Sequence, residues 1–147
     1  MAALLRKLVV QNEFSQNFRE EEGDLMSYLW TTIKVKNLEE SIDFYQEIVG
    51  LKVQRRFEAG PEREIAFLAA AAGETEVELI ADQGKDSIDV GGDISIGFEI
   101  DSVAEKIRFL KEKGVEVESG PVAPNPEIEF FYVLDPNGVK IQFVENK

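Results

Sequence analysis

The sequence predicts an α+β fold built from two copies of one module, each a strand, a helix and three further strands. The first observation is an internal repeat, in which Val35 aligns with Ile100 at an offset of 65 residues. The offset falls to 64 after one deletion near Val49. The second observation is that strand-like and helix-like periodicities follow the same order in both halves. A repeat of this length is a whole supersecondary unit, so the two copies should face each other and enclose a cavity.

The bulk composition is that of an ordinary globular protein. The chain has 147 residues, of which 44% are apolar and 31% charged. Its net charge of −13 repels phosphate backbones, so nucleic acid is not an expected partner. The apolar runs fall short of the ~20 residues of a membrane span, and the first ten residues lack a signal-peptide pattern. The chain has no cysteine, so we expect no disulfides, no thiol chemistry and a cytoplasmic location.

The repeat also predicts how the chain is organised. Residues 1–25 lie outside the repeat and are expected to form an N-terminal helical extension and linker. The domain itself is expected at 26–147, with module one at 27–83 and module two at 93–146. The extension has an amphipathic pattern, so it is expected to pack either on the domain or on a second subunit.

Module one is predicted to begin with a strand over 29–36, in which two faces alternate. Asn37 then caps a helix, with Glu40 three residues on, and Gly50 ends the helix in a left-handed conformation. The expected buried stripe of this helix is Leu38, Ile42, Tyr45 and Val49. The three strands that follow are expected over 51–58, 64–71 and 75–81.

Module two is predicted to repeat this plan from a strand over 94–100. Ser102 and Glu105 form a capping box for the second helix, which ends at Gly114. The expected buried stripe of that helix is Val103, Ile107 and Leu110. The remaining segments are expected to be a short strand over 115–118, a proline-containing loop over 120–126, and strands over 127–134 and 139–144 joined by an Asn-Gly turn.

The strands are expected to turn one apolar face to the helices and a second face to a shared groove. The residues predicted for this second face are Trp30, Thr32, Lys34, Glu76, Glu78, Ser95, Gly97, Glu99, Lys140, Gln142 and Val144. On an ordinary open sheet such residues simply face solvent. Trp30 favours a groove instead, because a tryptophan is rarely left bare on a strand.

Two segments carry a resemblance to a known family. Residues 37–45 read Asn-Leu-Glu-Glu-Ser-Ile-Asp-Phe-Tyr, followed by Gly-Leu at 50–51, and residues 135–143 read Asp-Pro-Asn-Gly-Val-Lys-Ile-Gln-Phe. Both resemble motifs of the vicinal oxygen chelate superfamily, which includes glyoxalase I, bleomycin-resistance proteins, ring-cleaving dioxygenases and fosfomycin-resistance enzymes. The resemblance covers residues 28–146. It implies two βαβββ modules forming a U-shaped eight-stranded mixed sheet around a metal site, in many relatives completed by a second subunit.

The same resemblance places the metal-ligand positions of glyoxalase-like members at Trp30, Glu78, Ser95 and Gln142. Only Glu78 is a strong ligand, since an indole N–H can only donate and the other two side chains are weak neutral ligands. The chain contains no histidine at all. The resemblance therefore implies a degenerate metal site, and we expect no metal cofactor, with a divalent cation as a less favoured alternative. The expected ligand-binding residues are Trp30, Thr32, Glu78, Ser95, Glu99 and Gln142.

Three functions stay open at this point. The favoured one is binding of a small molecule in the cavity between the modules, by a homodimer. The second is a glyoxalase-type lyase or isomerase, which uses an unusual metal site or Glu78 as its catalytic base. The third is a degenerate domain kept for assembly, with the N-terminal helix as the contact.

Overall fold

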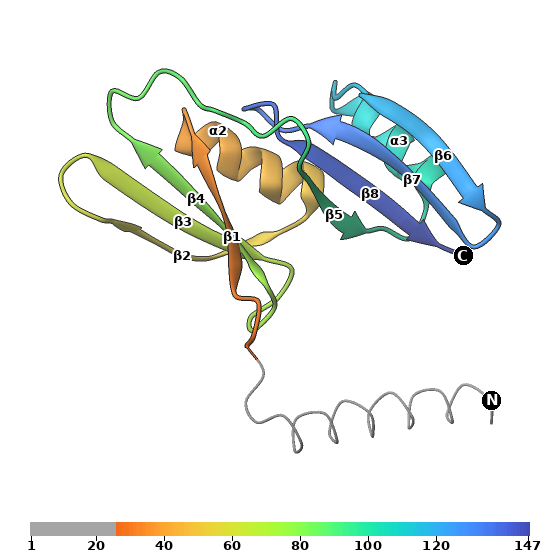
Figure 1. The fold of residues 1–147 in the computed structure, drawn as a ribbon, viewed down its shortest axis with the longest axis horizontal. Coiled ribbons are helices and arrows are strands. Elements are labelled where there is room, and N and C mark those ends of the chain that lie inside the picture. The colour runs from red at the N-terminus through yellow and green to blue at the C-terminus, as the bar shows by residue number, and fades with distance from the viewer. Residues whose placement is uncertain (1–25) are drawn as a thin grey trace, which may run out of the picture.

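The computed structural model describes residues 26–147 and shows two βαβββ modules, as the repeat predicts (Figure 1). The predicted extension at 1–25 lies outside the described residues. Module one consists of β1 (Trp30–Val35), α2 (Leu38–Asp43), η1 (Phe44–Val49), β2 (Lys52–Glu58), β3 (Arg63–Ala69) and β4 (Glu76–Asp82). Module two consists of β5 (Ser95–Glu99), α3 (Val103–Glu112), β6 (Ser119–Asn125), β7 (Ile128–Leu134) and β8 (Lys140–Asn146).

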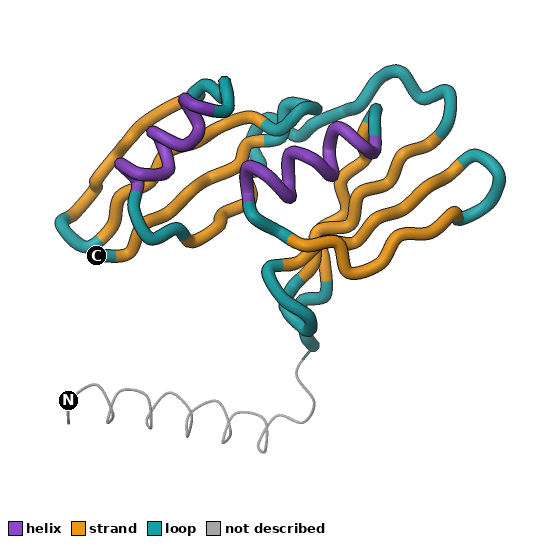
Figure 2. Tube along the Cα trace, turned by 180° about the vertical axis from the view of Figure 1, so that it is seen from behind, coloured by secondary structure: helices purple, strands orange, loops and turns teal. Residues whose placement is uncertain are grey.

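Each module forms a mixed four-stranded sheet, which confirms the predicted α+β class. The strand orders are β1-β4-β3-β2 and β5-β8-β7-β6, so the eight strands of the described chain form two sheets rather than one hydrogen-bonded sheet. The first strand of each module pairs in parallel with the last, and the other pairings are antiparallel. Each helical segment lies across one face of its own sheet (Figure 2). Among residues 26–147 no helix is long and apolar enough to cross a membrane.

The first helix confirms both predicted ends and differs in its middle. The Asn37 side chain accepts a hydrogen bond from the Glu40 amide at 3.0 Å, and Gly50 has a φ of 93°. The last six residues are wound as a π-helix, in which the Gly50 amide donates to the Tyr45 carbonyl. This wider turn rotates the buried stripe, so that Ile48 is buried and Val49, predicted to be buried, is only half-buried.

The predicted loop over 120–126 and strand over 115–118 are wrong: the strand is β6, at Ser119–Asn125. It pairs with β7 at only three positions, with register shifts between them. β6 is the outer strand of its sheet, where one side of the backbone needs no partner. Prolines are tolerated there because their missing N–H groups cost no sheet hydrogen bond.

One apolar core joins the two modules. Its buried residues come from the helices and from the helix-facing sides of both sheets, and include Tyr45, Leu110, Phe131 and Phe143. A core shared in this way fixes the modules against each other, because separating them would expose apolar surface from both.

Polar contacts reinforce this junction at the turn between β7 and β8. The buried Asp135 carboxylate accepts a hydrogen bond from the Tyr45 hydroxyl at 2.8 Å and from the amides of Asn137 and Val139, each at 2.8 Å. Asn137 in turn donates from its side-chain amide to the Ser41 hydroxyl at 3.1 Å. These hydrogen bonds attach the β7–β8 turn of module two to the first helix of module one.

Lys106 makes a second contact between the modules. Its ammonium donates to the carbonyl of Ile48, in the last turn of η1, and lies 4.7 Å from the centre of the Phe143 ring. Carbonyls at a helix C-terminus lack partners within the helix, so a lysine from α3 satisfies one of them. Burial lowers the pKa of Lys106.

Candidate functional site

The candidate site consists of the two sheet faces that the helices leave uncovered. The register of the strands places Trp30 beside Glu76 and Thr32 beside Glu78 on sheet one. On sheet two, β5 and β8 place Ser95 beside Lys140. The predicted binding residues therefore divide into two groups on different sheets: Trp30, Thr32 and Glu78 on the first, and Ser95, Glu99 and Gln142 on the second.

The uncovered face of sheet one carries an aromatic cluster. The ring of Trp30 stands edge-on to Phe67, with centroids 5.2 Å apart, and the ring of Phe57 is stacked on Phe67 with centroids 6.3 Å apart. Phe67 is buried, whereas Trp30 is 39% and Phe57 44% exposed. Trp30 thus packs against the buried ring of Phe67, and part of its own ring remains exposed for contact with a ligand.

Charged side chains lie beside this aromatic cluster, some of them paired with one another. The Arg55 guanidinium lies 3.8 Å from the centre of the Phe67 ring and makes two hydrogen bonds to Glu76, at 2.9 and 3.0 Å. Glu78 is half-buried and accepts a hydrogen bond from the Thr32 hydroxyl at 2.5 Å. Among residues 26–147, Glu78 makes no salt bridge, whereas Glu76, the carboxylate paired with Trp30 in the strand register, makes one with Arg55.

The uncovered face of sheet two is built from different groups. The Gln142 side-chain amide donates to the Tyr132 hydroxyl at 3.1 Å, and the Tyr132 ring stands edge-on to Phe130 with centroids 5.9 Å apart. Glu99 accepts a hydrogen bond from the Asn146 side chain at 2.7 Å. Gly97 leaves room for Gln142, whose amide oxygen lies 3.3 Å from the position that a Cβ would take there.

Two neighbouring pockets adjoin these faces. One, of about 240 Å³, lies along β1 and the linker and is lined by residues that include Thr32, Lys34 and Val90. The other, of about 360 Å³, lies on sheet two and is lined by Asp93, Ile94, Ser95, Ser119, Tyr132 and Lys140. Both include Ile94, which is 65% exposed, so the pockets meet at this residue. Of the predicted binding residues, Thr32 lines the first pocket and Ser95 the second, whereas Trp30, Glu78, Glu99 and Gln142 line neither.

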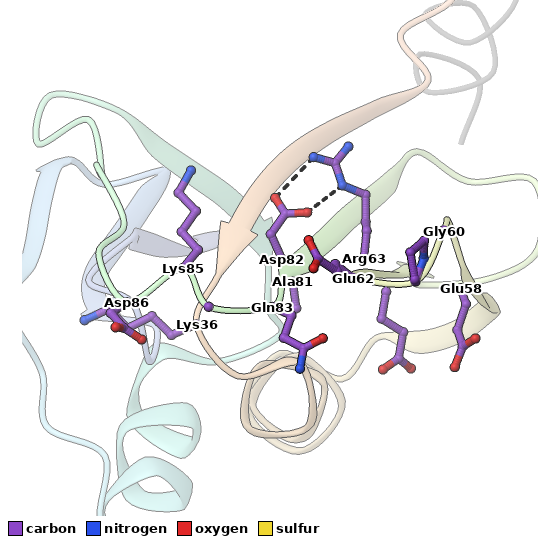
Figure 3. Close-up of a pocket in the computed structure, with 13 residues that line it drawn as sticks. Lys36, Glu58, Gly60, Glu62, Arg63, Ala81, Asp82, Gln83, Lys85 and Asp86 are labelled. Atoms are coloured by element: carbon purple, nitrogen blue, oxygen red, sulfur yellow. Dashed lines mark hydrogen bonds and ion pairs between the residues drawn. The ribbon is translucent and has the colours of Figure 1, made fainter.

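A further pocket, of about 310 Å³, lies away from the predicted site, at the β2–β3 turn and the end of β4 (Figure 3). Arg63 makes two hydrogen bonds to Asp82, at 2.6 and 3.2 Å, as the dashed lines show. Lys34 pairs with the same carboxylate at 3.3 Å. The bond from Arg63 is the main cause that lowers the pKa of Asp82. These charges satisfy one another, so we assign no ligand to this pocket.

The residues present do not fit the metal site that the family resemblance implies. Of the four positions, Trp30 has no lone pair to offer, and Ser95 and Gln142 are neutral oxygen donors. The amide nitrogen of Gln142 is directed to Tyr132, and Glu78 is bonded to Thr32. Among residues 26–147, no three histidine, cysteine or acidic side chains are grouped so that they could hold a metal ion. A single carboxylate falls short of the three or four ligands that a divalent transition metal needs.

Comparisons with known proteins agree with this fold. Residues 27–143 match the family model described as Glyoxalase/Bleomycin resistance protein/Dioxygenase superfamily, and the chain belongs to that superfamily. It is 37% identical to the lactoylglutathione lyase of Haemophilus influenzae over 131 residues, which cover 83% of this chain and 94% of that protein. It is 33% identical to the lactoylglutathione lyase of Neisseria meningitidis serogroup A over 129 residues, covering 83% of this chain and 92% of that protein.

Solved structures of the same fold include proteins of different function. The trypanothione-dependent glyoxalase I of Leishmania major superposes with a TM-score of 0.73 at 24% identity, covering 82% of this chain and 87% of that one. TnmS3, an antibiotic-binding protein from Streptomyces sp. CB03234, superposes with a TM-score of 0.63 at 22% identity, covering 84% of this chain and 98% of that one. At these identities the likeness establishes the fold, which serves both catalysis and binding.

Several residues of the candidate site were not predicted from the sequence. Phe67 was not singled out because β3 is almost continuously apolar and its alternation is hidden, and Arg55 and Phe57 on β2 were not singled out because their partners lie on other strands. The signal that finds them is the register: Phe67 lies opposite Glu78 on one side and Arg55 on the other. Tyr132 emerges in the same way, since it lies opposite Gln142.

Proposed function

We propose that this protein binds a small organic molecule on its uncovered sheet faces and does so without a glyoxalase-type metal ion. The observation that carries the proposal is that one sheet face holds both a partly exposed tryptophan ring, Trp30, and a carboxylate, Glu78, that makes no salt bridge with any residue of 26–147. A planar group stacks on the Trp30 ring, and Glu78 favours a positive charge on that group. The donor set at the four metal-ligand positions supports the absence of a metal.

A homodimer fits this proposal best. The predicted binding residues lie in two groups on different sheets, and a second copy can bring the sheet-one group of one subunit opposite the sheet-two group of the other. The resemblance to relatives whose cavities are completed across subunits supports the same arrangement. The mass of the particle in solution, measured by sedimentation equilibrium, tests it: a mass of one chain at all concentrations contradicts it.

We propose a cytoplasmic location, as the composition suggests.

The binding proposal is tested with two probes that share a ring system and differ in charge. We expect 1-methylquinolinium to bind more tightly than neutral quinoline in calorimetric titrations, and both to quench the fluorescence of Trp30, the single tryptophan. Glu78→Gln should weaken the cation severalfold and leave quinoline unchanged, because a partly exposed charge contributes about 1 kcal/mol. Glu47→Gln, on the exposed side of η1, is the matched control. Equal binding of the two probes contradicts the role of Glu78.

A glyoxalase-type lyase is the second candidate, and the lactoylglutathione lyases at 33–37% identity favour it. Formation of lactoylglutathione is measured with and without zinc, nickel and magnesium, beside elemental analysis of the purified protein. In an enzyme, Glu78→Gln should reduce turnover about 10²–10⁴-fold, the usual contribution of general acid–base catalysis. Stoichiometric metal and turnover would overturn the metal-free proposal.

A further inference from the structure

We infer that the pocket on sheet two binds the carboxylate of a small organic acid. This inference rests on the proposed small-molecule site and adds a second group to its ligand: a carboxylate held on sheet two, in addition to the planar positive group proposed for sheet one. The pocket draws one polar group from each strand of the sheet: Ser95 from β5, Lys140 from β8, Tyr132 from β7 and Ser119 from β6. Three of these groups carry hydroxyls and the fourth an ammonium, so the pocket offers donors from four directions.

The register explains why these side chains meet. Ser95 is paired with Lys140, and Ser119 with Tyr132. Lys140 and Tyr132 lie on the same face of neighbouring strands, because their positions on β8 and β7 alternate with the buried Ile141 and Val133. The four groups therefore form a band across the uncovered face, at the end of the sheet where β5 and β8 begin.

The hydrogen bond from Gln142 prepares Tyr132 to act as a donor. A phenol hydroxyl has one hydrogen to give, and it can accept at its oxygen. The Gln142 amide supplies the accepted bond at 3.1 Å, so the hydrogen of Tyr132 is left for a ligand. The space above Gly97 holds the amide oxygen of Gln142, which keeps its nitrogen turned toward Tyr132.

The charge balance of the pocket favours an anion. Within residues 26–147 the Lys140 ammonium makes no salt bridge, and Asp93 is the one carboxylate that lines the pocket. Lys140 is half-buried, so its charge is less screened than that of a lysine on an open surface. The net charge of −13 is spread over the chain, and at physiological salt its distant members are screened beyond about 8 Å. The Lys140 ammonium and the neighbouring hydroxyls therefore favour a ligand with a negative charge.

The test uses benzoate, its neutral analogue benzamide and inorganic phosphate, each titrated into the full chain and followed by amide NMR shifts. We expect saturable shifts with benzoate at the four polar residues Ser95, Ser119, Tyr132 and Lys140, and weaker or no shifts with the other two probes. Lys140→Met should weaken benzoate about tenfold, the equivalent of about 1.4 kcal/mol, and Tyr132→Phe severalfold. Lys111→Met, on the exposed side of α3, changes the net charge equally and should have no effect.

Each alternative result has a definite meaning. Equal binding of benzamide, or equal loss in Lys111→Met, would overturn the inference, because a local charge would then not be recognised. Phosphate bound as tightly as benzoate would overturn the choice of a carboxylate. The readout is separate from Trp30 fluorescence, so benzoate shifts on sheet two, together with a failure of 1-methylquinolinium to quench Trp30, would support this inference while contradicting the proposed function of sheet one.

Discussion

Replacing Tyr45 by phenylalanine removes one oxygen atom from the junction between the modules. The ring stays in place in the shared core, where Tyr45 is completely buried. What is lost is the hydrogen bond from the hydroxyl to Asp135, whose carboxylate is only 5% exposed and cannot turn to water. The substitution therefore isolates the polar contribution of one residue to the docking of module two on module one.

The expected loss is about 2 kcal/mol of the free energy of unfolding. A hydrogen bond to a charged group contributes roughly 1.5–3 kcal/mol. The cost stays within this range because the other oxygen of Asp135 keeps its two backbone donors, at 2.8 Å each. For a chain of this size the melting temperature should fall by about 4–8 °C. Urea unfolding followed by circular dichroism measures the change directly.

The dependence of stability on pH gives a second readout of the same contact. Burial, together with the neighbouring charge of Asp135, raises the pKa of Tyr45 far above its ordinary value of 10.0. The unfolded chain releases this proton near pH 10 while the folded chain keeps it. The stability contributed by Tyr45 is thus present in full below about pH 10 and decreases above it, by at most about 1.4 kcal/mol per pH unit. The gap between the wild type and Tyr45→Phe should therefore narrow above pH 10.

Tyr28→Phe is the matched control, since Tyr28 is 69% exposed and its hydroxyl is hydrogen-bonded to the neighbouring hydroxyl of Thr31. We expect it to change stability by less than about 0.5 kcal/mol. A double-mutant cycle with Asp135→Asn should show coupling, because the two residues are in direct contact. If Tyr45→Phe costs no more than Tyr28→Phe, or if the cycle shows no coupling, the reasoning about the junction is refuted.

Two further substitutions test other features of module one and its contact with module two. Gly50→Ala should lower the free energy of unfolding by about 1 kcal/mol, because the φ of 93° at Gly50 is unfavourable for an L-residue. The added Cβ itself meets no atom within 4 Å, so the cost comes from the backbone. Gly92→Ala is the control, since Gly92 has no left-handed φ and equally open space, and it should be close to neutral in thermal melts. Lys106→Met should lower the free energy of unfolding by about 1 kcal/mol, because the hydrogen bond to the Ile48 carbonyl is lost. The expected loss is kept this small because the lysine is only half-buried. Chemical denaturation of Lys106→Met and of the control Lys111→Met measures the difference, and equal stability of the two variants would contradict the capping role.

The sequence predicted the parts of the fold that depend on local signals. Asn37 and Ser102 cap their helices as expected, each accepting a hydrogen bond from the amide three residues on. The alternation in β1 predicted correctly that Ile33 and Val35 are buried while Trp30 is partly exposed. These signals are readable because capping and alternation depend on a few neighbouring residues.

The features that were missed depend on contacts distant in sequence. The π turn at Phe44–Val49 has no local signature in the capping pattern. The prolines of β6 predict a loop, and only the place of β6 at the edge of the sheet makes them acceptable in a strand. Arg55 was missed because its role comes from Phe67 and Glu76, which lie on other strands. The assignment of Glu78 and Gln142 to a binding site remains a prediction.

The seating of the β7–β8 turn on the first helix occurs once, although the chain is a repeat. At the corresponding positions of the other copy, Tyr45 is replaced by Leu110 and Asp135 by Ala71. Leu110 is buried without any hydroxyl to donate, and Ala71 is exposed. A chain cut in the linker would thus yield two fragments that form this hydrogen bond only with each other. The first fragment supplies the donor and the second the acceptor, so mixed pairs gain a bond that self-pairs lack. The two copies of the repeat are therefore not interchangeable at this contact.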